Sequence, residues 1–158
     1  MKGFTTFIFY IVLPAVFIAF LFWIGWGINF GKSHNFTLKD PLSNNLGIVS
    51  AKSLIFQRDL VLFNKEKTEV SVSKIYTDCK CISVTAPVGD YTFGPFSTPI
   101  EQNTKPLDII IPAGGELTLK TFIDLSGSPH GQFSSNIFIE SPDSTKPYSI
   151  PIKAIIGL

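Results

Sequence analysis

Cysteines are scarce in this 158-residue sequence, and clusters of like charge are absent from it. Its two cysteines, Cys79 and Cys81, are too few for a scaffold built on disulfides. Lys2 is the only charged residue before position 32, so residues 32–158 hold 12 of the 13 basic residues against all 12 acidic ones. This neutral balance gives no support for nucleic-acid binding. No repeat at a solenoid period is present either.

Charge is also absent from residues 3–31, an uninterrupted block of 29 residues. The block is long enough to cross a bilayer and about twice the length of a signal-peptide core. Fourteen of the residues at positions 4–24 are Leu, Ile, Val or Phe, and Trp23 and Trp26 follow, where amphipathic rings favour the headgroup layer. We therefore predict a retained N-terminal transmembrane anchor over residues 1–31 rather than a cleaved leader.

The two-residue leader before the anchor sets the expected orientation. With Lys2 and the amino terminus on the cytoplasmic side, the rest of the chain lies outside the cytoplasm, periplasmic or extracellular, on a single pass through the inner membrane. The lipid bilayer is then one expected partner. Aromatic side chains of the anchor could equally face lipid or pack on partner helices; the candidates for partner contact are Phe7, Phe17, Phe20, Trp23 and Trp26.

Beyond the anchor, the pattern indicates a short tether and one β domain. Residues 32–46 are polar and are predicted to link the membrane to a domain over 47–158. Turn residues separate short alternating or β-branched runs there, and no segment shows a helical period. This pattern favours an immunoglobulin-like β-sandwich preceded by one transmembrane helix. The expected strands cover residues 53–63, 69–75, 80–85, 107–111, 116–124, 132–141 and 148–156.

Residues 86–106 form the one segment that does not fit a compact sandwich. They hold four prolines and two glycines, and structureless loops of this length are uncommon and usually functional or disordered. Tyr91, Phe93 and Phe96 argue against disorder, because exposed aromatic rings are not expected in a solvated linker. Two interpretations stay open: a loop folded over one end of the sandwich, or a partner-binding loop that uses these three rings.

The closely spaced cysteines are the only group with chemical character. On an extended strand the Cα atoms of residues i and i+2 lie about 6.6 Å apart, at the upper edge of what a disulfide tolerates. A bond between Cys79 and Cys81 would therefore need a bulge or turn. Two thiolates on one face would instead suit a soft ion such as Cu(I), which makes both cysteines candidate metal ligands. They could also be small side chains that fill the core at a strand end.

No nucleophile–base pair stands out, and His130 lies in a turn sequence typical of solvent-facing residues. The Gly114-Gly115 pair lacks the strand-to-helix context of a phosphate loop. We therefore expect no enzymatic activity, no cofactor and no small-molecule substrate.

Read with its neighbours, the cysteine region resembles a bacterial immunoglobulin-like family of unknown function, related to domains of cilia and centrosome proteins. The family pattern is Phe-x-Asn, a β-run, Ser-Cys-Gly-Cys-Thr, Ile-x-Pro-Gly-Glu, a strand ending in Phe-Asp, a glycine and a closing strand pair. Lys80 stands where the family has the glycine between the cysteines. The resemblance covers about residues 55–156 and includes Leu62-Phe63-Asn64, Val70 to Ile75, Thr77 to Cys81, Ile110 to Glu116, Phe122-Ile123-Asp124, Gly131 and Ile137 to Ser141.

The resemblance implies an exported interaction module. Together with the anchor, it predicts an accessory or assembly subunit that docks on other integral membrane proteins of a complex. The alternative prediction, from a different class, is a copper-handling protein that uses Cys79 and Cys81.

Overall fold

The computed structural model describes residues 16–20, 36–50, 54–99 and 107–157. The chain divides into two compact units, Met1–Lys32 and Ser33–Leu158. In the first unit the described residues, 16–20, are helical, and Phe17 and Phe20 are exposed. Within the part of the chain that the structure describes, no helix has the length and apolar character needed to cross a bilayer. The predicted anchor, with Phe7, Trp23 and Trp26, otherwise lies outside the described residues.

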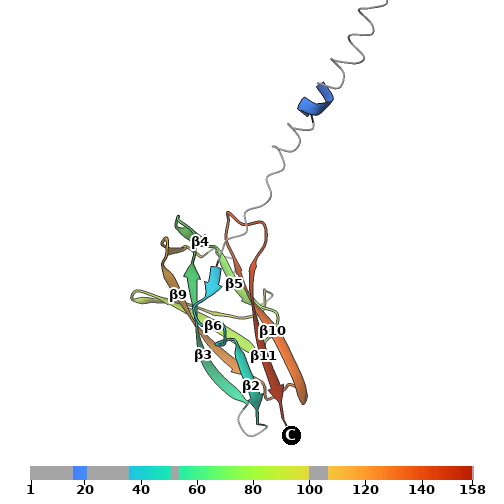
Figure 1. Cartoon of the computed structure of the whole chain (residues 1–158). Helices are drawn as coiled ribbons and strands as arrows, with labels where there is room; N and C mark the ends of the chain where they lie inside the picture. Colours follow the sequence, from blue (N-terminus) through green and yellow to red (C-terminus); the bar gives the residue numbers. More distant parts are fainter. Residues whose placement is uncertain (1–15, 21–35, 51–53, 100–106, 158) are drawn as a thin grey trace, which may run out of the picture. The chain divides into compact units, whose positions relative to one another are not determined.

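The second unit is an all-β sandwich, which confirms the predicted layer architecture (Figure 1). A five-stranded sheet has the order β1-β3-β9-β6-β7, a four-stranded sheet has the order β2-β11-β10-β5, and β4 pairs with β8. The strands are β1 (Phe36–Leu38), β2 (Asn45–Val49), β3 (Ile55–Asn64), β4 (Val70–Val72), β5 (Lys74–Thr77), β6 (Ile82–Val88), β7 (Tyr91–Phe96), β8 (Ile109–Ile111), β9 (Glu116–Asp124), β10 (Gly131–Glu140) and β11 (Tyr148–Ile156).

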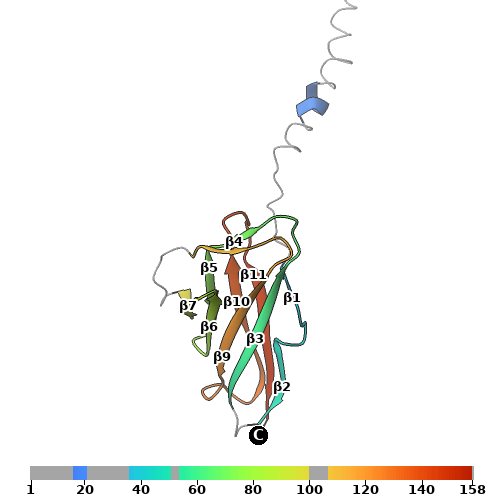
Figure 2. The same ribbon diagram turned by 90° about the vertical axis from the view of Figure 1, so that its left-hand side faces the viewer.

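The two larger sheets enclose one apolar core. Figure 2 shows β3 and β9 of one sheet in front of β10 and β11 of the other. Alternate residues of the central strands β6, β9 and β11 point inward, as the period of two requires. In β9 the buried residues are Leu117, Leu119, Thr121 and Ile123, and in β11 they are Ile150, Ile152, Ala154 and Ile156.

Pro151 has a position that explains why an internal strand tolerates it. β11 lies between β2 and β10, and its pairing with β2 is irregular between Lys153 and Ile155. Pairing with β2 begins only at Lys153, so no strand faces the β2 side of Pro151. There the Asn44 side chain donates to Pro151 O at 2.6 Å. The missing amide hydrogen of proline therefore removes no ladder bond.

Two segments differ from the sequence-based expectation. The predicted tether over 32–46 contains β1 and the start of β2: β1 pairs with β3, and β2 runs parallel to β11. The predicted loop over 86–106 begins inside β6 and contains β7, which pairs antiparallel with β6. In both cases a short, polar or Gly/Pro-containing segment becomes a strand because a longer neighbour offers it a free edge.

Candidate functional site

The cysteine pair lies in the turn that connects β5 to β6, the strands of two different sheets. The two sulfur atoms form a disulfide, and the Cα atoms of Cys79 and Cys81 are 5.1 Å apart. This separation is shorter than on an extended strand because the chain turns here: Ile82 N donates to Cys79 O at 3.2 Å. The chain therefore makes the turn that a disulfide requires. Of the interpretations that the sequence leaves open for the two cysteines, the structure shows the disulfide.

Hydrogen bonds from three directions hold this turn. Thr77, which is fully buried, places its hydroxyl 2.8 Å from Cys79 O and 3.2 Å from Ile82 O. Asp124 N on β9 donates to Cys81 O at 2.8 Å. The position of the cysteines is thus determined by contacts that do not involve sulfur.

Asp78 supplies the third set of contacts, to β10. Its carboxylate accepts hydrogen bonds from the Ser135 hydroxyl, from Asn136 N at 2.7 Å and from Asn136 Nδ2 at 2.8 Å. Burial acts to raise the pKa of Asp78, but the hydrogen bonds from Asn136 and Ser135 outweigh it and lower that pKa below its ordinary value. The ionised carboxylate of Asp78 therefore holds the turn against β10, the strand that pairs with β5.

The sulfur atoms themselves have unequal surroundings. Both cysteines are partly buried, and Cys81 packs against the core. Cys81 N donates to Cys79 Sγ at 3.1 Å, and the residue between them, Lys80, is exposed. Within the described residues no group of three or more His, Cys, Asp or Glu could hold a metal ion. Copper binding by the two thiolates would require the reduced protein, and it stays a prediction.

The predicted aromatic loop is divided by the fold. Phe93 and Phe96 on β7 are partly buried and pack against the core, whereas Tyr91 at the start of β7 is 77% exposed. Of the three rings expected to bind a partner, Tyr91 alone projects into solvent to this extent. The role of all three in partner binding stays a prediction.

Two isoleucines that the sequence reasoning did not single out lie side by side on the outer face of the four-stranded sheet. Ile48 on β2 is the register partner of Ile155 on β11, and they are 80% and 48% exposed. We call them the Ile48–Ile155 patch. The alternation along β11 indicates that Ile155 faces solvent, because Ile156 next to it faces the core. No local pattern indicates that β2 pairs with β11 in the register that places Ile48 beside Ile155.

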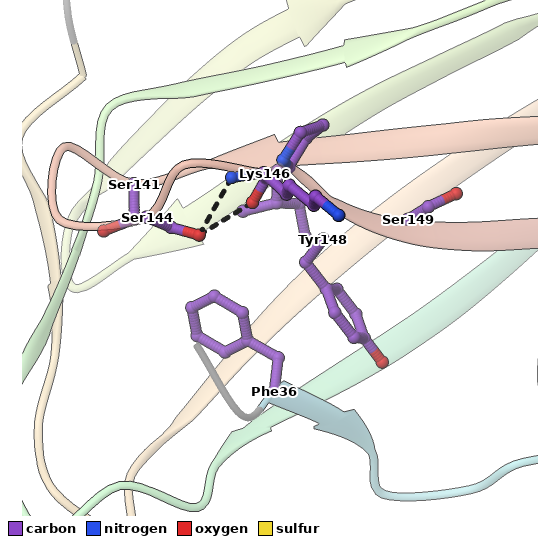
Figure 3. Close-up of a pocket in the computed structure, with 8 residues that line it drawn as sticks. Phe36, Ser141, Ser144, Lys146, Tyr148 and Ser149 are labelled. Carbon is purple, nitrogen blue, oxygen red and sulfur yellow. Dashed lines mark hydrogen bonds between the residues drawn. The ribbon is translucent and has the colours of Figure 1, made fainter. Parts of the chain in front are cut away.

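A small cavity lies between the start of β1 and the connection from β10 to β11 (Figure 3). Its volume is about 100 Å³. The Phe36 ring meets the Tyr148 ring edge-on at 5.6 Å, and burial raises the pKa of Tyr148. The Ser144 hydroxyl donates to Lys146 O at 2.7 Å. The buried Ser141 hydroxyl has no hydrogen-bond partner among the described residues.

Comparison with known proteins identifies the fold and no more. No family model matches the sequence, and no curated protein matches it. A family 123 glycoside hydrolase from Clostridium perfringens aligns with a TM-score of 0.50 at 7% identity, over 79% of this chain and 27% of the hydrolase. A protein of unknown function from Porphyromonas gingivalis aligns with a TM-score of 0.51 at 15% identity, over 80% of this chain and 51% of its own.

A third similar structure is the ASH/PapD-like domain 7 of a human protein, at 8% identity over 78% of this chain and 84% of that domain. Its TM-score of 0.40 is too low to support an argument. The chain spans about a quarter of the hydrolase and about half of the Porphyromonas protein. The class established by fold and comparison is thus an all-β sandwich.

Our expectation that the chain is not an enzyme needs correction. The same fold forms part of a glycoside hydrolase, so a sandwich without an obvious catalytic set in its sequence does not exclude an enzyme. At 7% identity the likeness concerns the fold alone and assigns no activity to this chain.

Proposed function

We propose that this protein is a membrane-anchored, immunoglobulin-like domain that acts outside the cytoplasm as an accessory or assembly subunit of a larger membrane-protein complex. The observation that carries the proposal is the Ile48–Ile155 patch, which lies on the edge strand β2 and its neighbour β11. The uncharged block of residues 3–31 supports the anchor, and the domain would then work close to the membrane surface.

The place of the family motifs in the fold supports the immunoglobulin-like assignment. Asn64, which follows the Phe of the first motif, donates through Nδ2 to Ile111 O at 3.2 Å and to Pro112 O at 2.9 Å. Asn64 N donates to Gly115 O at 2.9 Å. Motifs separated by about fifty residues in the sequence therefore meet at one end of the sandwich, as members of one structural unit would.

The docking surface combines an open strand edge with exposed apolar side chains. β2 is the terminal strand of its sheet, and an edge strand presents backbone amides and carbonyls that can pair with another chain. Ile48 would contact a side chain of such a strand directly, whereas Ile155 lies one strand farther from it, on β11, and would be covered by a partner segment that also packs on the outer face of the sheet. The partner that fits is an extended apolar segment of a neighbouring membrane subunit, added to the sheet at β2.

The gain from covering this patch is moderate. Burying an isoleucine completely stabilises by about 1.5–3 kcal/mol, so exposed fractions of 80% and 48% correspond to about 3 kcal/mol for the pair. This amounts to about a hundredfold in Kd. A membrane anchor would raise the effective concentration of the domain near its partner, so a contact of this strength would suffice.

Mild detergent extraction followed by native gel electrophoresis tests the proposal. Before extraction, the wild-type chain should be found in the membrane fraction. After extraction, it should migrate in a complex larger than itself. The double substitution Ile48→Ser with Ile155→Ser should release it as a monomer. Ile110→Ser is the matched control, because Ile110 is a strand isoleucine that is 52% exposed but lies in the small sheet. A lone wild-type monomer under every mild condition, or equal loss of the complex in both variants, would refute the proposal.

A further inference from the structure

The Cys79–Cys81 disulfide contributes little to holding its own turn. A cross-link that closes so short a loop removes far less freedom from the unfolded chain than one that spans a domain. The turn is already held by the Thr77 hydroxyl, the Asp78 carboxylate and the Asp124 amide. The bond can therefore open without the loss of the contacts that position its two sulfur atoms.

The surroundings of the two sulfur atoms favour one direction of bond opening. The amide of Cys81 points at Cys79 Sγ across 3.1 Å, and a negative charge that develops on that sulfur would be stabilised by this donor. Cys81 packs on the core on one side and remains partly exposed on the other. Cys79 is thus the sulfur better suited to leave as a thiolate.

We propose that Cys79 and Cys81 form a thiol–disulfide exchange site whose co-reactant is a dithiol, two cysteines of a partner protein. A partner thiolate attacks Cys81 Sγ, the bond between the two sulfur atoms breaks, and its electron pair leaves on Cys79 Sγ. The second partner thiolate then attacks the partner's first sulfur atom in the mixed disulfide and releases Cys81 as a thiolate. The partner becomes a disulfide, this chain gains two electrons, and the two protons that the partner thiols lose go to Cys79 and Cys81.

A dithiol is the appropriate co-reactant because its second thiol lies beside the mixed disulfide as soon as the first has reacted. The resolving step is then intramolecular, with the rate advantage of a high effective concentration. A monothiol lacks this step: a second monothiol molecule must resolve the mixed disulfide, in competition with attack by Cys79 on Cys81 Sγ, which restores the starting bond. The exchange site is independent of the Ile48–Ile155 patch, and the absence of a stable complex would not remove it.

The first experiment uses the full-length wild-type chain in detergent, with dithiothreitol as the dithiol probe. The protein is equilibrated in graded mixtures of reduced and oxidised dithiothreitol without denaturant, quenched with acid, alkylated and weighed by mass spectrometry. We expect a reversible two-electron titration, with the circular dichroism of the sheet unchanged in the fully reduced protein. Reduction that occurs only together with unfolding would overturn the proposal and identify the bond as a structural cross-link.

The second experiment tests the unequal roles of the two sulfur atoms. Cys81→Ser keeps the backbone amide at position 81 and leaves Cys79 as the free thiol, whereas Cys79→Ser leaves Cys81. At neutral pH, iodoacetamide should alkylate Cys79 in the first variant about tenfold faster than Cys81 in the second. Equal rates, or a faster Cys81, would refute the assignment. If either variant fails to fold, peptide mapping of the glutathione mixed disulfide in the wild type provides the same comparison, with glutathione expected on Cys81.

Discussion

Replacement of Asn64 by alanine should destabilise the sandwich more than any change on its surface. Asn64 is the last residue of β3 and is fully buried. Its Nδ2 donates to Thr68 O at 2.9 Å as well as to the carbonyls of Ile111 and Pro112, and its Oδ1 accepts from Glu66 N at 2.9 Å. This one side chain therefore joins the connection after β3 to the turn that precedes β9.

The expected cost follows from these contacts. Nδ2 carries two hydrogens for three carbonyls, so the side chain makes the equivalent of three full hydrogen bonds. At about 1 kcal/mol net for each, Asn64→Ala should lower the free energy of unfolding by about 3 kcal/mol. For a domain of this size that corresponds to roughly 4 °C per kcal/mol, or a fall of about 12 °C in Tm.

Asn64→Asp makes the same position dependent on pH. An ionised carboxylate would face three carbonyl oxygens in a buried site, so the pKa of the introduced carboxyl should rise above its unfolded value of about 3.9. A group whose folded pKa is raised contributes its stability below the unfolded pKa and loses it as pH rises through the folded pKa. The variant should therefore be most stable in acid relative to the wild type, and should weaken toward neutral pH.

Urea denaturation of the full-length chain in detergent, followed by circular dichroism of the sheet, measures both effects. Asn45→Ala is the control, because Asn45 is exposed and its side chain makes one local hydrogen bond, from Gly47 N at 3.0 Å. The control should lose less than about 1 kcal/mol. Equal losses in the alanine variants of Asn45 and Asn64, or a loss below 1 kcal/mol at Asn64, would refute the reasoning.

Two further predictions concern titratable groups at the ends of the sandwich. The pKa of Asp78 is lowered in the folded protein, so its carboxylate contributes stability above the unfolded pKa and loses that contribution as pH falls through the folded pKa. Below about pH 4, the free energy of unfolding measured in urea should therefore fall less steeply in Asp78→Asn than in the wild type. A slope that does not change would show that the clamp to β10 adds nothing. Burial raises the pKa of Tyr148, so stability should be lost as pH rises above about 10, and Tyr148→Phe should reduce that loss when both proteins are followed by thermal unfolding. An identical alkaline profile in the two proteins would contradict this.

The sequence alone determined the class of the fold and most of the long strands. The alternation of apolar residues over 116–124 and 148–156 predicts strands whose bounds are those of β9 and β11. The turn residues at 112–115 predict the reversal before β9. These features follow from local chemistry, because a period of two allows an extended segment to bury one face and solvate the other.

The tertiary structure decided which segments pair and which side chains meet. β1 and β2 are short and lie in a polar segment, and β7 contains Gly94 and Pro95, so local patterns do not indicate them; they are strands because β3, β11 and β6 offer them hydrogen-bonding edges. The same nonlocal pairing aligns Ile48 with Ile155, and the Asp78 contact with β10 helps hold the turn in which Cys79 and Cys81 come close enough to bond. Register and turn geometry depend on contacts between residues distant in the chain, and local periodicity contains no information about them.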